Sequence, residues 1–346
     1  MKTDNNYYVL TENGCDISLD KFHICTWDVK EQRAFIEVGV SIPIQENTPE
    51  NINIYIALPF VTQKCEIISL HKSLGDDSNF RFVFNRTHTN KVVIDNDLRN
   101  GSIFIIDEEE NNDVRFAIVD ARATIINEQN IVKFELRKPQ NIHRLYARVL
   151  IKTNTETLAN TVSGITKKDY LYDIKINEAR NIPDKIFNYN RDNNLHIIKI
   201  EQIFCLHAIP EKWNINYSDS SKLKNVRRLE IDAFKNYMNW VEKIDDEYLI
   251  TFSKYSGNDG CSFFTSFSNE YVSNRQLLVA VITNLVCSML IGWASIKFSA
   301  GKESHWYSDI PITYYIAIFF VLLAVLYCWN IPSLCWRKIK SLCSSK

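Results

Sequence analysis

Two uncharged apolar segments near the C-terminus, 277–296 and 312–329, constrain the fold of this chain more than any other feature. An α-helix rises about 1.5 Å per residue and the hydrocarbon core of a bilayer is about 30 Å thick, so each segment is long enough to cross as a helix. The sequence therefore predicts a transmembrane helical hairpin over 276–331. A pair of buried core helices is the alternative, but two adjacent segments with aromatic residues at their ends favour the membrane.

The residues around the hairpin predict its orientation. The start of the chain has no apolar core and no small-residue cleavage site, so no secretory signal is expected. Arg275 precedes the first segment and a basic tail, 332–346, follows the second, whereas the loop between them balances its lysines with Glu303 and Asp309. By the positive-inside rule, the loop is outside, and the N-terminal body and the tail are in the cytoplasm, with the hairpin in a cell inner membrane.

The polar body before the hairpin has the pattern of a β-rich domain. From 21 to 207, short runs rich in Ile, Val, Phe and Tyr are separated by Asn, Asp, Gly and Pro, as expected for strands and turns. We expect a mainly β, sandwich-like fold with one or two pairs of sheets, each with one face in water. The predicted strands are 21–27, 33–42, 53–60, 80–85, 91–95, 102–107, 114–123, 131–137, 145–152, 169–176 and 196–206.

Three further segments complete the expected domain organisation. A stretch rich in Asn and charge, 182–194, is a candidate linker inside a first domain, 1–207. Apolar residues at three- and four-residue steps predict one long amphipathic helix over 221–244, which docks on its own domain or on another copy of the chain. Two strands, 247–252 and 261–267, flank a turn-rich loop and predict a hairpin next to the membrane. Helix and hairpin form a second region, 208–275.

The sequence lacks the motifs of the common catalytic and cofactor chemistries. It has nine glycines in 346 residues, and none of them forms GxGxxG or GxxxxGK[ST]. HExxH and GxSxG do not occur either. The nine cysteines contain no CxxC pair, and the seven histidines have no metal-ligand spacing. We therefore expect no enzyme, metal or cofactor, although a catalytic site assembled from distant residues would leave no motif.

Basic side chains in the β-rich body are candidates for binding an anion. A nucleotide or short oligonucleotide needs several cations, together with Tyr or Phe rings on which its bases can stack. Ordinary solvated sheet surface is the alternative, and a cluster that lines a pocket would favour the ligand. The candidate ligand-binding residues are Arg81, Arg86, Lys91, Arg144, Arg148, Lys152, Arg227 and Arg228.

Small and polar residues share one helical face of the first apolar segment. Lipid offers an amide or hydroxyl group no hydrogen-bond partner, so this face should contact other helices or water. Two helices cannot enclose a water path, and a pore therefore needs several copies of the chain. Tight packing against the second segment is the alternative. The predicted pore or helix-packing face consists of Ala280, Thr283, Asn284, Cys287, Ser288, Gly292 and Ser295.

A cytoplasmic β-rich body followed by a compact transmembrane hairpin resembles the membrane effectors of bacterial anti-phage signalling. These include the channel-forming subunit of Hailong-type systems and the transmembrane effectors of cyclic-oligonucleotide defence. The resemblance covers domain order alone. It implies a homo-oligomeric, ligand-gated pore or membrane-disrupting protein, a nucleotide-derived signal, and a partner enzyme that produces this signal. A membrane-tethered binding or scaffolding module without channel activity is the second hypothesis.

Overall fold

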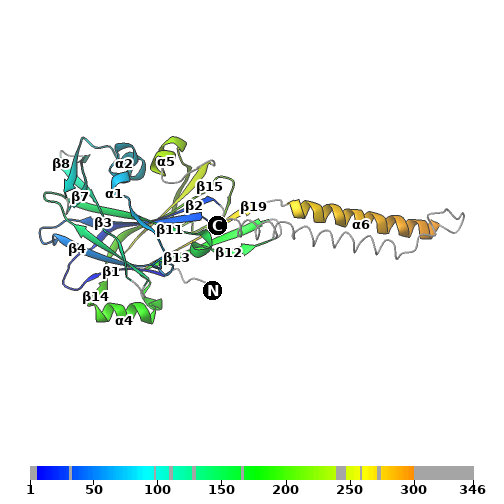
Figure 1. Ribbon diagram of the computed structural model, residues 1–346, viewed down its shortest axis with the longest axis horizontal. Helices are drawn as coiled ribbons and strands as arrows, with labels where there is room; N and C mark the ends of the chain where they lie inside the picture. The colour runs from blue at the N-terminus through cyan, green and yellow to red at the C-terminus, as the bar shows by residue number, and fades with distance from the viewer. Residues whose placement is uncertain are drawn as a thin grey trace, which may run out of the picture. The chain divides into compact units, whose positions relative to one another are not determined.

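The chain forms two compact units, residues 1–270 and residues 271–346. The first unit is mainly β, as predicted (Figure 1). The computed structural model describes residues 6–30, 33–96, 99–108, 112–126, 130–164, 167–238, 247–257, 259–270 and 274–299.

One sheet of the first unit has nine strands within the described residues. They are β1 (Asn6–Glu12), β4 (Asn51–Ala57), β9 (Thr124–Ile126), β10 (Ile131–Arg137), β12 (Asn160–Ser163), β13 (Lys167–Ile176), β14 (Leu195–Ile197), β16 (Asn214–Ser218) and β19 (Cys261–Glu270). Their order is β16-β19-β13-β1-β4-β10-β9, with β12 beside β13 and β14 beside β1. The sheet is mixed, because β1 pairs parallel with β13 and antiparallel with β4.

The other sheet has ten strands within the described residues. They are β2 (Leu19–Lys30), β3 (Arg33–Pro43), β5 (Ile67–Ser69), β6 (Asn90–Asn96), β7 (Arg99–Glu108), β8 (Asn112–Val119), β11 (Arg144–Thr153), β15 (Ile200–Pro210), β17 (Leu223–Arg228) and β18 (Tyr248–Ser256). Their order is β17-β18-β15-β2-β3-β11-β8-β7-β6, with β5 beside β11. This sheet is mixed too, because β15 pairs parallel with β2 and β11 with β8.

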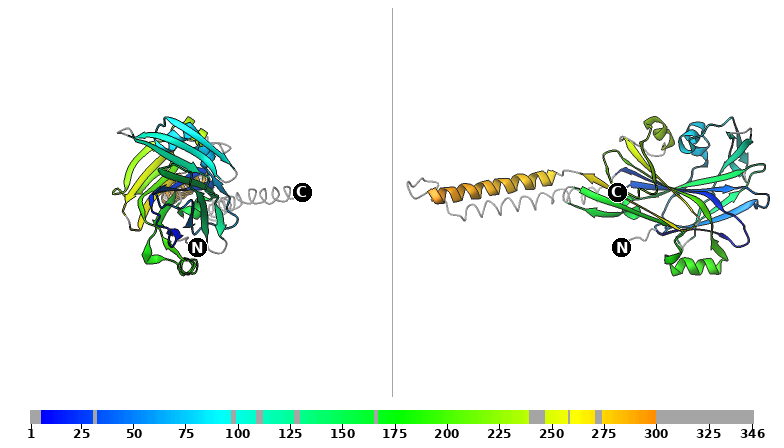
Figure 2. Two further views of the ribbon diagram at one scale, coloured as in Figure 1. Left: turned by 90° about the vertical axis from the view of Figure 1, so that its left-hand side faces the viewer. Right: turned by 180° about the vertical axis from the view of Figure 1, so that it is seen from behind.

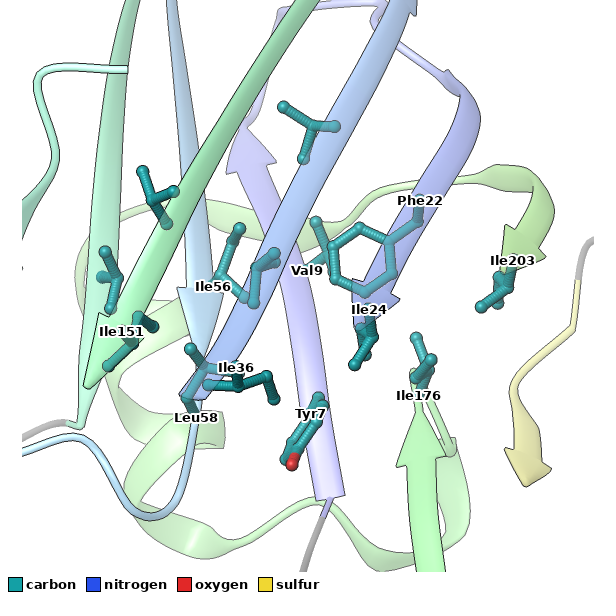
Figure 3. Close-up of a cluster of buried hydrophobic side chains, with 14 of the residues drawn as sticks. Tyr7, Val9, Phe22, Ile24, Ile36, Ile56, Leu58, Ile151, Ile176 and Ile203 are labelled. Carbon is teal, nitrogen blue, oxygen red and sulfur yellow. The ribbon is translucent and has the colours of Figure 1, made fainter. Parts of the chain in front are cut away.

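The main hydrophobic core lies between the two sheets, which form a sandwich (Figure 2). Val9 and Ile56 come from the nine-stranded sheet, and Phe22 and Ile36 come from the ten-stranded sheet; all four are fully buried (Figure 3). Alternate side chains of each strand enter this layer, because successive residues of a strand point to opposite faces. Burying one such side chain stabilises the fold by about 1.5–3 kcal/mol.

Short helices cover the outer faces of both sheets (Figure 1). Trp27 of β2 stacks on Phe234 of α5 with ring centroids 5.4 Å apart, and the same apolar cluster holds α1 and α2 on the ten-stranded sheet. Ile186 of α4 packs against Leu195 on the nine-stranded sheet. The helices are α1 (His71–Leu74), α2 (Asp77–Phe84), α3 (Thr155–Leu158), η1 (Ala179–Asn181), α4 (Asp184–Asp192) and α5 (Ile231–Tyr237).

The predicted strand 80–85 is wrong, because this segment belongs to α2. The Asp76 side chain accepts hydrogen bonds from the backbone N–H groups of Ser78 and Asn79, which caps the start of the helix. The helix ends at Asn85, whose φ of 50° is left-handed. The other predicted strands before residue 207 correspond to observed strands, and 196–206 covers two of them, β14 and β15.

The predicted long helix over 221–244 is also wrong. Its first part is the edge strand β17, which pairs antiparallel with β18, and only 231–237 is helical, as α5. Pairing with β18 satisfies backbone groups at Leu223–Arg228 that a helix would otherwise have satisfied internally. Residues 239–246 lie outside the described part of the chain.

Two local predictions fail because strands pair with distant partners. The segments 247–252 and 261–267 are strands, but β18 pairs with β15 whereas β19 pairs with β13, so they form no hairpin. The predicted linker 182–194 contains α4 and packs on the nine-stranded sheet. The predicted boundary after residue 207 falls inside β15, which continues to Pro210.

The second unit contains α6 (Asn274–Ser299), which covers the first predicted apolar segment. Among the described residues, no helix combines the length and apolar character that crossing a membrane requires. The second predicted segment, 312–329, and the basic tail, 332–346, lie outside the described residues.

A polar cluster interrupts the core between the sheets. Asp28 accepts hydrogen bonds from the hydroxyl groups of Tyr172 and Thr155, the second at 2.9 Å. His207 contacts Thr26 through Nδ1 at 2.7 Å. Burial raises the pKa of Asp28 to about 6, although the two hydroxyl donors oppose this rise. Burial also lowers the pKa of His207 to about 3.

These shifts predict how stability changes with pH in an Asp28→Asn variant. The unfolded pKa of Asp is about 3.9, so ionised Asp28 destabilises the fold above pH 6 and this cost disappears as the pH falls toward 4. We expect the unfolding free energy of the wild type to rise by about 2–3 kcal/mol relative to D28N between pH 7 and pH 4. His207 acts in the opposite direction, but equally in both proteins. Urea unfolding at several pH values measures the difference, and a difference independent of pH would contradict it.

Candidate functional site

A cavity of about 360 Å³ opens on the outer face of the ten-stranded sheet, beside the C-terminal end of α2. Strands β2, β3, β8, β11, β15, β17 and β18 line its walls, together with Phe84 of α2 and Asn85. Drug-sized ligands occupy pockets of about 300–1,000 Å³, so this cavity is large enough for one small molecule.

Gly39 of β3 allows a close contact between residues that line this cavity. It pairs with His23 of β2 on one side and with Arg148 of β11 on the other. A Cβ atom at this position would lie 2.6 Å from Oη of Tyr146 and 3.4 Å from Nε of Arg148. The absence of a side chain lets Tyr146 reach across β3, where its Oη contacts Nδ1 of His23 at 2.9 Å. A glycine inside a strand is typical of such a close approach.

The cavity has a buried ion pair at its inner end. Nη1 of Arg148 lies 3.3 Å from Oε2 of Glu37, and Tyr237 of α5 donates a hydrogen bond of 2.9 Å to the same oxygen. Only 5% of Arg148 and none of Glu37 is exposed. Burial raises the pKa of Glu37, while the charge of Arg148 and the hydrogen bond from Tyr237 oppose the rise.

Three polar atoms at this end have no hydrogen-bond partner among the described residues. Nε of Arg148 and Oγ of Ser41 belong to residues that line the cavity, and the third atom is Oε1 of Glu37. Ser41 is 1% exposed. A buried polar atom without a hydrogen-bond partner costs about 1–3 kcal/mol. A ligand that formed hydrogen bonds with these atoms would recover this cost and bind more tightly.

The rim of the cavity carries positive charge. Lys21 lines it, and its pKa is lowered by partial burial and by the neighbouring cations Arg144, Arg86 and Lys254, whereas Asp20 opposes the shift. Neighbouring cations disfavour the charged form of Lys21, and a bound anion would offset this repulsion. Exposed Arg227 on β17 adds a further charge to the lining.

Aromatic rings line much of the remaining wall. Phe84 and Tyr146 meet edge to face with centroids 5.0 Å apart. On the other side, Phe204 and Phe252 are stacked with centroids 5.6 Å apart, and Phe204 also contacts His23 at 4.9 Å. The cavity therefore combines flat apolar surfaces with cations and buried donors.

The structure places two of the eight predicted ligand-binding residues, Arg148 and Arg227, in the lining of this cavity. Arg144 and Arg86 lie outside the lining but act electrostatically on Lys21, and Arg144 is paired with Asp20 at 3.0 Å. The sequence missed Lys21, His23, Ser41 and Gly39. A glycine inside a predicted strand was the signal that could have indicated the close approach of Tyr146 to β3.

The other four predicted residues lie elsewhere. Lys91 pairs with Asp77 at 3.2 Å. Lys152 pairs with Glu66 at 2.8 Å. Arg228 pairs with Glu211, and Arg81 is an exposed residue of α2.

All residues of the predicted face of the first apolar segment are exposed on α6, and so are its apolar residues Val281, Leu285, Leu290 and Ile291. Half-buried residues lie on the opposite side of this helix. The exposed residues are Ala280, Thr283, Asn284, Cys287, Ser288, Gly292 and Ser295, and the half-buried residues are Ile282, Val286, Met289 and Trp293.

No family model matches this sequence, and no curated protein is significantly similar to it.

Proposed function

We propose that this chain is an oligomeric membrane effector, a ligand-gated pore or membrane-disrupting protein whose β-rich body senses an anionic signal. In this proposal, segments 277–296 and 312–329 enter the inner membrane of a bacterium, and both the body and the basic tail stay in the cytoplasm. The signal is a nucleotide or short oligonucleotide made by a partner enzyme during anti-phage defence. Domain order supports this setting.

One observation carries the pore half of the proposal, namely the exposure of the small and polar face on α6. An amide such as that of Asn284 finds no partner in lipid, and the corresponding face of another copy can supply one. Each polar contact between helices contributes about 0.6–2 kcal/mol. Several copies would bury this face or hydrate it jointly.

The cavity on the ten-stranded sheet supports the sensing half. Lys21 and Arg227 supply cations, and Phe204 and Phe252 supply ring faces. Cations with adjacent aromatic rings are the usual requirements for binding a nucleotide without a phosphate-binding loop.

Dye release from liposomes tests the proposal. The purified full chain is reconstituted in dye-loaded liposomes of anionic phospholipid and challenged with a panel of nucleotides and short oligonucleotides. We expect release that depends on the protein and changes at least tenfold with one member of the panel. A chain that binds a nucleotide yet never releases dye would contradict a pore.

The cavity alone also favours a second candidate, a membrane-tethered binding module. It predicts that an unrelated two-helix anchor in place of 276–331 preserves all cellular activity. Loss of activity with this anchor, while ligand binding is unchanged, supports the effector instead.

A further inference from the structure

Strand β6 (Asn90–Asn96) is an edge of the ten-stranded sheet within the described residues, with β7 as its neighbour. An edge strand presents backbone N–H and C=O groups that can pair with a strand of another chain. The backbone N–H of Lys91 donates to Oδ1 of the adjacent Asn90 at 2.7 Å, so a side chain takes the place of a neighbouring strand there. Val92 and Val93 are 49% and 66% exposed. In the described part of the chain, this edge therefore exposes apolar side chains.

The strands at the other ends of the two sheet orders each have a feature that discourages such pairing. β9 is only three residues long, and the register of β16 shifts along its pairing with β19. β17 has three basic residues among its six. Short length, irregular register and basic side chains are usual means by which edge strands avoid association. In contrast, β6 is seven residues long, pairs with β7 without a register shift, and has an apolar centre, Val92–Ile94.

The sequence of β6 is complementary to itself in an antiparallel pair. If a twofold axis passes through Val93, Lys91 of each copy lies opposite Asp95 of the other copy. In the same register, Val92 lies opposite Ile94. Opposite charges and β-branched residues that face each other across two strands stabilise an antiparallel pair. A twofold axis also makes the contact self-complementary, as in most homodimers.

Two further observations agree with this register. The ammonium group of Lys91 lies 3.2 Å from Asp77 of α2, but it has three donors and can contact a second carboxylate. The edge strand β17 at the other end of the sheet lacks the complementarity of β6. Antiparallel pairing about the centre of β17 places Lys224 of one copy opposite Arg227 of the other, and like charges directly opposite are destabilising.

We propose that β6 is a surface for self-association, on which two copies of the chain pair their β6 strands antiparallel about Val93. The ten-stranded sheets of the two copies then form one continuous sheet. The partner is a second copy of this chain, because the charges at Lys91 and Asp95 match in this register. One pair of seven-residue strands is a small interface, so the association is weak and reversible. It requires neither a membrane nor a nucleotide and therefore goes beyond the proposed function.

Disulfide trapping of the full chain in detergent tests this register, because a covalent bridge captures a weak contact. Residues directly opposite in an antiparallel pair have Cα atoms about 4.5–5.5 Å apart, which a disulfide can span. Val93→Cys should therefore form a bridge between position 93 of two copies under mild oxidation. Peptide mass spectrometry identifies this bridge and distinguishes it from bridges between the native cysteines.

Val92→Cys is the matched control. In the proposed register, position 92 of the two copies would be diagonal neighbours about 7–8 Å apart, too far for a disulfide without backbone movement. We expect about tenfold more bridge at position 93 than at position 92 for this reason. Association through α6 alone would bring copies together without aligning β6 and would favour neither position. Equal yields, a higher yield for V92C, or no bridge at position 93 would overturn the proposal. Pairing of β6 with β17 of another copy, or with an unrelated protein, would give the last of these results.

Charge exchange in the V93C background tests the complementarity itself. Lys91→Glu places two acidic residues opposite each other and should lower the yield of the position-93 bridge severalfold. Adding Asp95→Lys restores an opposite-charge pair, so the yield should recover. Circular dichroism verifies that each variant is folded. A yield that K91E leaves unchanged, or that K91E/D95K does not restore, would overturn the proposal. Dye release without a bridge at position 93 would refute this inference and leave the proposed function standing.

Discussion

Replacing Arg148 with Met should lower the free energy of unfolding by about 3–5 kcal/mol, because the substitution leaves Glu37 as a buried carboxylate without its cation. Urea unfolding of the full chain measures this loss. Lys152→Met is a matched control on the same strand. Its pair with Glu66 is largely exposed, so its loss should cost less than about 1 kcal/mol.

A second substitution tests whether the unpaired negative charge of Glu37 causes the loss of stability in R148M. In the double variant R148M/E37Q, the amide has no charge and still accepts the hydrogen bond from Tyr237, so most of the stability should return. Nucleotide binding should not return, because Arg148 is still absent. A double variant no more stable than R148M would contradict this explanation.

The same pair predicts a pH dependence for R148M. Without Arg148, nothing cationic opposes the rise in the pKa of Glu37 that burial causes. The carboxyl group of the variant therefore takes up a proton at a higher pH than in the wild type. The destabilisation by Glu37 in R148M is complete above its raised pKa and disappears as the pH falls toward the unfolded pKa of Glu, about 4.3, so the stability deficit of R148M should shrink as the pH falls.

Replacing Asn284 and Ser288 together with Leu should abolish dye release from liposomes. Leucine removes the amide and hydroxyl groups that would line a pore or join helices, and it makes this face suitable for lipid. The body should stay folded and keep its nucleotide affinity, since both substitutions lie in the second unit. We expect at least a tenfold decrease in release.

The control for this variant is Ile282→Leu with Val286→Leu. These positions have the same four-residue spacing but lie on the half-buried side of α6. Exchange of one aliphatic side chain for another usually costs less than about 1.5 kcal/mol, so release should persist. Unchanged release in N284L/S288L, or equal loss in both variants, would contradict the role of the polar face.

Strand positions could be predicted from the sequence wherever alternation was clear. The segment 131–137 matches β10, and 145–152 lies within β11. Alternation misled at 80–85, where the helix start at Asp76 was the better signal. The first strand, β1, was missed, although it lies between β13 and β4 in the nine-stranded sheet.

Strand pairing could not be predicted, because it depends on contacts between residues far apart in the sequence. β18 and β19 are adjacent in the chain, yet they belong to different sheets. Similarly, the segment 221–228 has an apolar pattern typical of a helix. In the structure, its residues Leu223–Arg228 form an edge strand that pairs with β18. Local propensity is weak beside such tertiary contacts.

The candidate site could be predicted only in part for the same reason. Basic residues pointed to Arg148 and Arg227, but nothing local showed that they share a cavity with Lys21. The sequence also did not show that Arg148 forms a buried ion pair with Glu37.

The mass of the detergent-extracted full chain tests the central claim most directly, since the account requires several copies to bury or hydrate the polar face of α6. Light scattering coupled to size-exclusion chromatography should give a mass of several chains for the wild type, and a shift toward one chain for N284L/S288L. A wild type that is strictly monomeric, with and without nucleotide and in several detergents, would contradict the account.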